Sequence, residues 1–138
     1  MLRFKLLLTS AVLTGTALTG TAAAHTEITR MVPAASSSVA APKTVTLDLS
    51  EPINLRFSTF KVYALPAGSD PAALSQAKLN LKNDGAARAD LFPGASGLAA
   101  RVQLPLKPKL KPGAYVVMWH LLSDDGHPVS GQSVFRIK

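Results

Sequence analysis

The chain has 138 residues, a formal net charge of +7 and no cysteine. Without cysteine it can form no disulfide, no iron–sulfur cluster and no thiolate nucleophile. This length is that of one domain with one hydrophobic core.

The beginning of the chain resembles a secretory signal peptide. Arg3 and Lys5 carry positive charge, and residues 6–20 are uncharged and largely apolar. Three alanines at positions 22–24 supply the small side chains that a signal peptidase requires. The apolar run is short for a membrane-spanning helix, so an uncleaved membrane anchor is the weaker interpretation.

We expect cleavage after Ala24, so that residues 1–24 are the signal and residues 25–138 the mature domain. The mature chain then has 114 residues, a charge of +5 and His25 as its first residue. The main alternative is cleavage one residue earlier, which leaves Ala24 ahead of the histidine.

Short apolar or alternating runs follow, separated by proline, glycine, serine and asparagine. Val45, Leu47 and Leu49 alternate with polar residues and so share one face of a strand. Residues 115–122 are apolar on both faces, which is typical of a central strand. Prolines, Pro52 among them, are expected between strands. The expected strands are residues 27–31, 44–50, 58–64, 87–92, 98–104, 113–123 and 131–137.

One helix is expected over residues 70–78, with Asp70 as its cap and Pro71 at its first position. About seven short strands in a domain of this size predict an all-β fold. We expect an Ig-like antiparallel β-sandwich of the Greek-key type.

The basic residues of the mature domain are scattered, except for Lys107, Lys109 and Lys111, which alternate with Pro108 and Leu110. Lysines separated in this way are typical of a solvated loop, and the functional alternative is docking to an anionic surface. No aromatic residue lies among the lysines to stack on bases, so nucleic acid is not an expected partner.

Three residues near the two ends of the mature chain could bind a metal ion. As the first residue, His25 offers an amine and a ring nitrogen, groups that lose their protons near neutral pH at little cost. Asp125 and His127 add a carboxylate and a second imidazole. On a straight strand these two would stand roughly 6–7 Å apart, but Gly126 lets the backbone bend. Mixed nitrogen and oxygen ligands suit Cu(II), although an accidental histidine and a simple turn are the structural alternatives.

The same residues carry a family resemblance. Residues 123–131 read Ser-x-Asp-Gly-His-Pro-x-x-Gly, after an aromatic-containing strand and before a last strand with Phe135. The mature chain starts with His25 and continues through Met31 to Pro33. These features resemble the CopC/PcoC copper-resistance family over essentially the whole mature chain. The two ends carry the specific motifs, whereas the middle is only strand-like.

The resemblance implies an exported copper-binding β-sandwich with one Cu(II) ion per chain. Its ligands are then the amine and ring of His25, the carboxylate of Asp125 and the ring of His127. We accordingly expect a monomer in the periplasm or elsewhere in the cell envelope. It sequesters copper or delivers it to a membrane transporter of the CopD type, and it is not an enzyme.

Some members of that family hold a Cu(I) ion in a methionine-rich loop. Here Met31 and Met118 are the methionines left after the signal, and each lies alone in an expected strand, where methionine usually fills a core. We therefore expect no Cu(I) site. Trp119 and His120 are interpreted as structural residues. Asp124 either tunes its neighbour by charge or is solvated.

Two other functions compete with copper storage or delivery. A histidine-brace oxidase would also use an N-terminal histidine on a β-sandwich. The chain has only eight aromatic residues for a sugar-binding face, and Asp125 would occupy a position that oxygen needs. An Ig-like interaction module without metal would make all three ligand matches coincidental.

Overall fold

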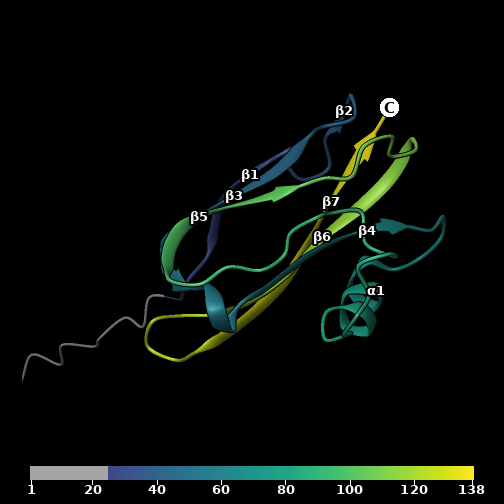
Figure 1. The fold of residues 1–138 in the computed structure, drawn as a ribbon. Helices are drawn as coiled ribbons and strands as arrows, with labels where there is room; N and C mark the ends of the chain where they lie inside the picture. The colour runs from purple at the N-terminus through teal and green to yellow at the C-terminus, as the bar shows by residue number, and fades with distance from the viewer. Residues whose placement is uncertain (1–24) are drawn as a thin grey trace, which may run out of the picture.

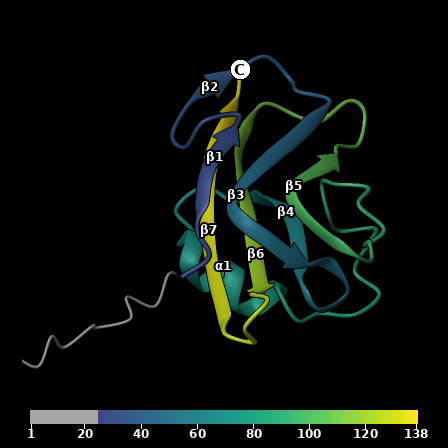
Figure 2. The same ribbon diagram turned by 90° about the vertical axis from the view of Figure 1, so that its left-hand side faces the viewer.

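The computed structural model describes residues 25–138, so the expected signal peptide at 1–24 lies outside the described residues. Two sheets pack face to face (Figures 1 and 2). One contains β1 (Ile28–Val32), β3 (Thr44–Asn54) and β5 (Leu98–Pro105) in the order β1-β3-β5. The other has the order β2-β7-β6-β4, from β2 (Ser38–Val39), β7 (Pro128–Ile137), β6 (Gly113–Leu122) and β4 (Thr59–Leu65). The predicted β-sandwich is confirmed.

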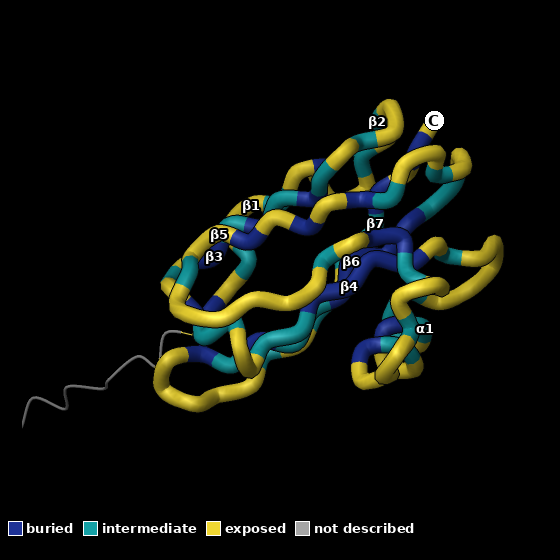
Figure 3. Tube along the Cα trace, viewed as in Figure 1, coloured by how far each residue is buried: buried dark blue, intermediate teal, exposed yellow. Residues whose placement is uncertain are grey.

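The main hydrophobic core fills the space between the sheets. Val45, Leu47 and Leu49 of β3 are at most 6% exposed, as their alternation predicts. They meet buried side chains of the opposite sheet, among them Phe135 and Leu121. In Figure 3 the buried segments follow the facing strands, whereas the connecting loops are mostly exposed.

A second, smaller core lies on the outer face of the four-stranded sheet. Val116 and Met118 of β6 pack there with Tyr63 of β4 and with Leu79, which follows helix α1 (Pro71–Lys78). Strand β6 is therefore buried on both faces and lies between β7 and β4, so the predicted central strand is confirmed. Asp70 caps α1 by accepting a hydrogen bond from Ala73 N–H, as expected.

Two expectations about the strands are wrong, and one strand was not expected. Residues 87–92 form no strand and contribute one isolated bridge, Asp90 to Leu106. The two-residue β2 was not expected, because so short an element shows no periodicity in the sequence. It pairs parallel to β7. Pro52 lies inside β3, where the register with β5 shifts between Asp48 and Ile53, and a disrupted ladder tolerates proline.

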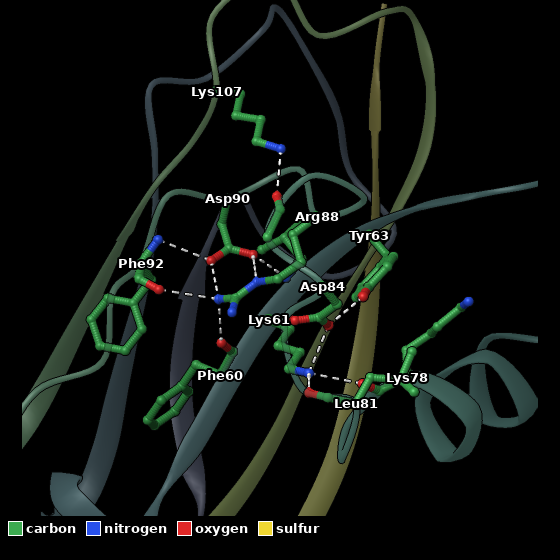
Figure 4. Close-up of polar contacts among 12 residues, drawn as sticks. Phe60, Lys61, Tyr63, Lys78, Leu81, Asp84, Arg88, Asp90, Phe92 and Lys107 are labelled. Carbon is green, nitrogen blue, oxygen red and sulfur yellow. Dashed lines mark hydrogen bonds and ion pairs between the residues drawn. The ribbon is translucent and has the colours of Figure 1, made fainter.

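A buried polar cluster explains the irregular course of residues 79–92 (Figure 4). The ammonium of Lys61, a residue 3% exposed on β4, donates hydrogen bonds to the carbonyls of Lys78 (2.9 Å) and Leu81 (2.8 Å) and to the carboxylate of Asp84 (2.7 Å). The Tyr63 hydroxyl donates to the same carboxylate. Burial alone would raise the pKa of Asp84, but the hydrogen bonds from Lys61 and Tyr63 outweigh it and hold that pKa below its ordinary value.

A second buried pair extends this cluster. The Arg88 guanidinium donates to both carboxylate oxygens of Asp90 and to the carbonyl of Phe60 (3.1 Å). Asp90 also accepts the backbone N–H of Val62 at 2.8 Å. Backbone hydrogen bonds remain at Ala89, whose N–H donates to the Val62 carbonyl at 2.7 Å, and at Leu91, whose N–H donates to the Pro105 carbonyl at 2.7 Å. The side-chain bonds of Asp90 lie between them, so no continuous ladder forms. Within residues 25–138, no helix has the length and apolar character needed to cross a bilayer.

Candidate metal centre

The β6–β7 turn, residues 123–127, bends back on itself as the glycine predicted. The Gly126 N–H donates to the Ser123 carbonyl at 2.9 Å, and the Ser123 N–H donates to the His127 carbonyl at 3.0 Å. Gly126 has a φ of +84°, in the left-handed region that a residue without Cβ adopts readily. The turn therefore presents Asp125 and His127 on one short, closed loop.

Asp125 and His127 lie in direct contact. Oδ2 of Asp125 is 2.9 Å from Nδ1 of His127, and the two side chains are 58% and 67% exposed. Ser123 holds the pair in place from the buried side of the turn, where it is only 4% exposed. Its hydroxyl contacts Oδ1 of Asp125 and accepts the His127 N–H at 3.0 Å.

The same contacts keep the Asp125 carboxylate ionised. The hydrogen bond from the Ser123 hydroxyl, and then that from His127, lower the pKa of Asp125 from its ordinary value to about 2. The carboxylate therefore carries its negative charge at neutral and at mildly acidic pH. An ionised carboxylate beside an imidazole is a suitable half-site for a divalent cation.

The segment after His25 is fixed to the end of β3. Thr26 is 1% exposed, and its hydroxyl donates to Oε1 of Glu51 at 2.5 Å. Glu27 exchanges two hydrogen bonds of 2.9 Å with Ser50, one from each backbone N–H. His25 itself is exposed.

His25 and the β6–β7 turn belong to the same end of the sandwich. Strand β3, which holds the segment after His25, continues to Ile53, and Ile53 forms a bridge with Ser123 at the base of the turn. Figures 1 and 2 both show the beginning of the described chain and the β6–β7 turn toward this end.

Two of the three predicted ligands are in contact, and the third is not part of their cluster. Across residues 25–138, no group of three or more histidine, aspartate or glutamate side chains is close enough to hold a metal ion. Asp125 and His127 form the preassembled half of the candidate site. His25 stands at the exposed start of the described chain, next to the anchored Thr26.

Two residues that organise this end were not predicted from the sequence. Ser123 supports both members of the pair, and its place in the Ser-x-Asp-Gly-His motif was the available signal. Glu51 holds the residue after His25, and no motif in the sequence identified it.

The remaining candidates lie elsewhere. The half-buried His120 has its Nδ1 at 2.7 Å from the Ser130 hydroxyl and lines a hollow beside α1, although it lies on β6 only three residues before the turn. Met118 is fully buried in the outer core, whereas Met31 packs against the main core. Trp119 also packs against the main core. These positions agree with the structural roles expected for all four residues.

Comparison with known proteins gives one consistent family. The model of the CopC domain matches residues 28–138. The chain is 34% identical to Protein YobA of Escherichia coli strain K12 over 116 residues, which cover 83% of this chain and 80% of that protein. It is 32% identical over 115 residues to an Escherichia coli protein named Copper resistance protein C, covering 83% and 82% of the two chains.

Solved structures agree with this result. The crystal structure of PcoC, described as a methionine-rich copper resistance protein from Escherichia coli, is similar with a TM-score of 0.59 and 28% identity. The match covers 83% of this chain and 100% of that one. The crystal structure of CopC from Methylosinus trichosporium OB3b gives a TM-score of 0.57 and 28% identity, and covers 83% and 94% of the two chains.

Proposed function

We propose that this chain, which belongs to the CopC domain family, binds one Cu(II) ion per molecule through His25, Asp125 and His127. The observation that carries the proposal is the contact between Asp125 and His127 in a turn closed by Ser123. This half-site shares an end of the sandwich with the segment that begins at His25.

A tetragonal Cu(II) ion could take the place of the proton in the hydrogen bond between Asp125 and His127, because that pair already has the separation of neighbouring metal ligands. Two bonds of about 2 Å at a right angle separate neighbouring ligand atoms by about 2.8 Å. The distance between Oδ2 of Asp125 and Nδ1 of His127 is 2.9 Å. Asp125 contacts Ser123 through Oδ1, so it can keep that contact while Oδ2 binds the ion.

His25 would complete the ligand set with its amine and its ring. It is exposed, so its side chain can change rotamer at a cost of about 1 kcal/mol, which a metal bond exceeds. The anchored Thr26 limits how far the histidine can move from the turn. The proposal requires cleavage after Ala24, because only then does His25 carry a free amine.

The biological role that we propose follows from this donor set. Four strong ligands from the protein leave little room for a substrate, which favours storage or delivery of copper over catalysis. We propose an exported monomer of the cell envelope that sequesters copper or passes it to a membrane transporter of the CopD type. The chain has three methionines and no cysteine, so we propose no methionine-rich Cu(I) site.

Electron paramagnetic resonance of protein that starts at His25, loaded with one equivalent of Cu(II), tests the proposal. The expected spectrum is a single axial signal with couplings to several nitrogens. His127→Ala should remove one ring coupling, whereas the matched control His120→Ala should leave the spectrum unchanged. A heterogeneous spectrum of weakly held surface copper would mean that the site does not exist.

A further inference from the structure

The two ends of the sandwich carry opposite charge. At the end opposite the β6–β7 turn, the chain passes through residues 40–43, 65–70, 105–113 and 136–138, and Asp70, which caps α1, is the one acidic residue of these segments. They contain six basic residues, which we call the basic end: Lys43, Lys107, Lys109, Lys111, Arg136 and Lys138. The other end carries Glu51, Asp124 and Asp125 on β3 and the β6–β7 turn, together with Arg56 in the short helix that follows β3.

Backbone pairing brings these distant residues together. The Leu106 N–H donates to the Lys43 carbonyl at 2.9 Å, which joins the start of β3 to the loop after β5. The Lys138 N–H donates to the Val39 carbonyl at 2.9 Å, and Ile137 pairs with Gly113 at the start of β6. Figure 1 shows the C-terminus beside the loops of this end.

The fold leaves the positive charge of the basic end uncompensated. All of its members except Lys107 are exposed, and none takes part in an ion pair among the described residues. Lys107 is committed to the fold, because its ammonium donates to the carbonyls of Gly85 (2.7 Å) and Ala86 (3.2 Å). Five free cations on one small surface repel one another unless an anionic partner compensates them.

The surface between the lysines is apolar. A hollow of about 400 Å³ is lined by Pro42, Leu106 and Leu110 together with Lys43 and Lys109. The methylene stems of lysines can lie on such a surface while their ammonium groups reach outward. This combination is the one found where a protein rests on the headgroup layer of a membrane.

We propose that the basic end docks the protein onto an anionic lipid surface. Four of the five free cations are lysines, which act as mobile point charges and do not form the planar fork that recognises one fixed carboxylate. Their distribution over three segments gives charge without a shaped pocket, and this fits a diffuse bilayer surface better than an acidic protein. Docking would turn the β6–β7 turn away from the lipid, toward the surrounding solution. The proposal does not depend on copper binding.

Sedimentation with vesicles of phosphatidylcholine containing about 30% phosphatidylglycerol tests the surface. A lysine near an anionic membrane contributes about a fivefold factor, so the variant Lys109→Gln, Lys111→Gln, Lys138→Gln should bind roughly a hundredfold more weakly. Binding should vanish in about 0.5 M salt and on vesicles of phosphatidylcholine alone. Copper should not change it.

The matched control variant is Arg30→Gln, Arg56→Gln, Lys82→Gln, which removes the same charge from outside the basic end. It should bind vesicles like the wild type. An equal loss in the control would show that net charge alone drives binding and would overturn the proposal. Failure of the wild type to bind vesicles, with binding to polyglutamate instead, would identify an acidic protein as the partner.

The orientation has its own test, because Trp119 is the single tryptophan. It lies six residues along β6 from Gly113, roughly 20 Å from the basic end. Lipids brominated in their acyl chains should leave its fluorescence unchanged while the protein is bound. Strong quenching of Trp119 would mean that the other end faces the bilayer.

Discussion

The β6–β7 turn and the buried cluster around Lys61 both combine carboxylates with nitrogen bases, but water reaches only the turn. The side chains of Asp125 and His127 are 58% and 67% exposed, whereas those of Lys61 and Asp84 are 4% and 10% exposed. In the turn, both side chains expose more than half of their surface to solvent. In the cluster, every donor of the Lys61 ammonium has an acceptor.

This difference separates a group that is free to bind from one that holds the fold. A buried charge that loses its partner lowers the free energy of unfolding, so the folded protein keeps the Lys61 cluster intact. An exposed pair costs little to break and can exchange one partner for a metal ion. Disturbance of the turn should therefore change copper binding, and disturbance of the cluster should change stability.

The largest expected effect comes from acid. Between pH 8 and pH 5, protons compete for the amine and imidazole nitrogens, and copper affinity should fall roughly a thousandfold or more. Asp125 should contribute nothing to this loss, because its pKa of about 2 keeps it ionised. The pKa of Asp84 is lowered as well, so the stability that it contributes is fully present above the ordinary aspartate range, starts to fall within that range and is lost completely only below the lowered pKa.

Titration of copper against a competing chelator at several pH values measures the loss, and circular dichroism monitors the fold. Copper should leave while the β-sandwich stays intact. Unfolding in parallel with copper release would remove the distinction between the two clusters.

Lys61→Met should lower the free energy of unfolding by about 3–5 kcal/mol, because it leaves Asp84 charged and buried without its cation. The copper affinity of the folded protein should not change. Urea denaturation gives the first quantity and copper titration the second.

The exposed Lys82→Met is the matched control and should cost less than about 0.5 kcal/mol. The double variant Lys61→Met, Asp84→Leu should recover part of the stability, because no buried charge is then left alone, although the carbonyls of Lys78 and Leu81 still lack their donor. A cost of the single variant similar to that of the control would show that the cluster does not support the fold.

His127→Ala should have the opposite pattern. Loss of one ligand should weaken copper at least about a hundredfold, whereas stability should change by less than about 0.5 kcal/mol, because the side chain is exposed. Calorimetric titration and urea denaturation of the same sample give both values. His120→Ala is the control, and an equal loss of copper there would place the site elsewhere.

Ser123→Ala should give the smallest effect, and it should lower both the copper affinity and the stability of the fold. The hydroxyl supports Asp125 and His127, and loss of such a support typically costs about tenfold or more in metal affinity. Ser123 is also buried, so about 1 kcal/mol of stability should be lost with it. An unchanged affinity would mean that the turn keeps its shape without the hydroxyl.

Patterns that repeat over several residues made most of the fold predictable. The alternation of Val45, Leu47 and Leu49 and the apolar β6 identified the facing layers correctly. The strand predicted at residues 87–92 does not form. The side chains of Arg88 and Asp90 bind the backbone of β4, and local periodicity in the sequence does not show such long-range bonds.

The candidate site also has one part that was predictable from the sequence and one part that was not. The contact of Asp125 with His127 was predictable, because both residues and the glycine between them lie within one turn. The support of the segment after His25 by Glu51 was not, since it joins residues 25 positions apart.

Copper titration of two proteins that differ only at the first position tests the central proposal most directly. One protein begins with His25, and the other carries one additional residue before it, so that the histidine keeps its ring but loses its free amine. We predict that the extended protein binds Cu(II) at least about a hundredfold more weakly, a loss comparable to that of His127→Ala. Equal affinity of the two proteins would contradict it, because the amine of His25 would then not be a ligand.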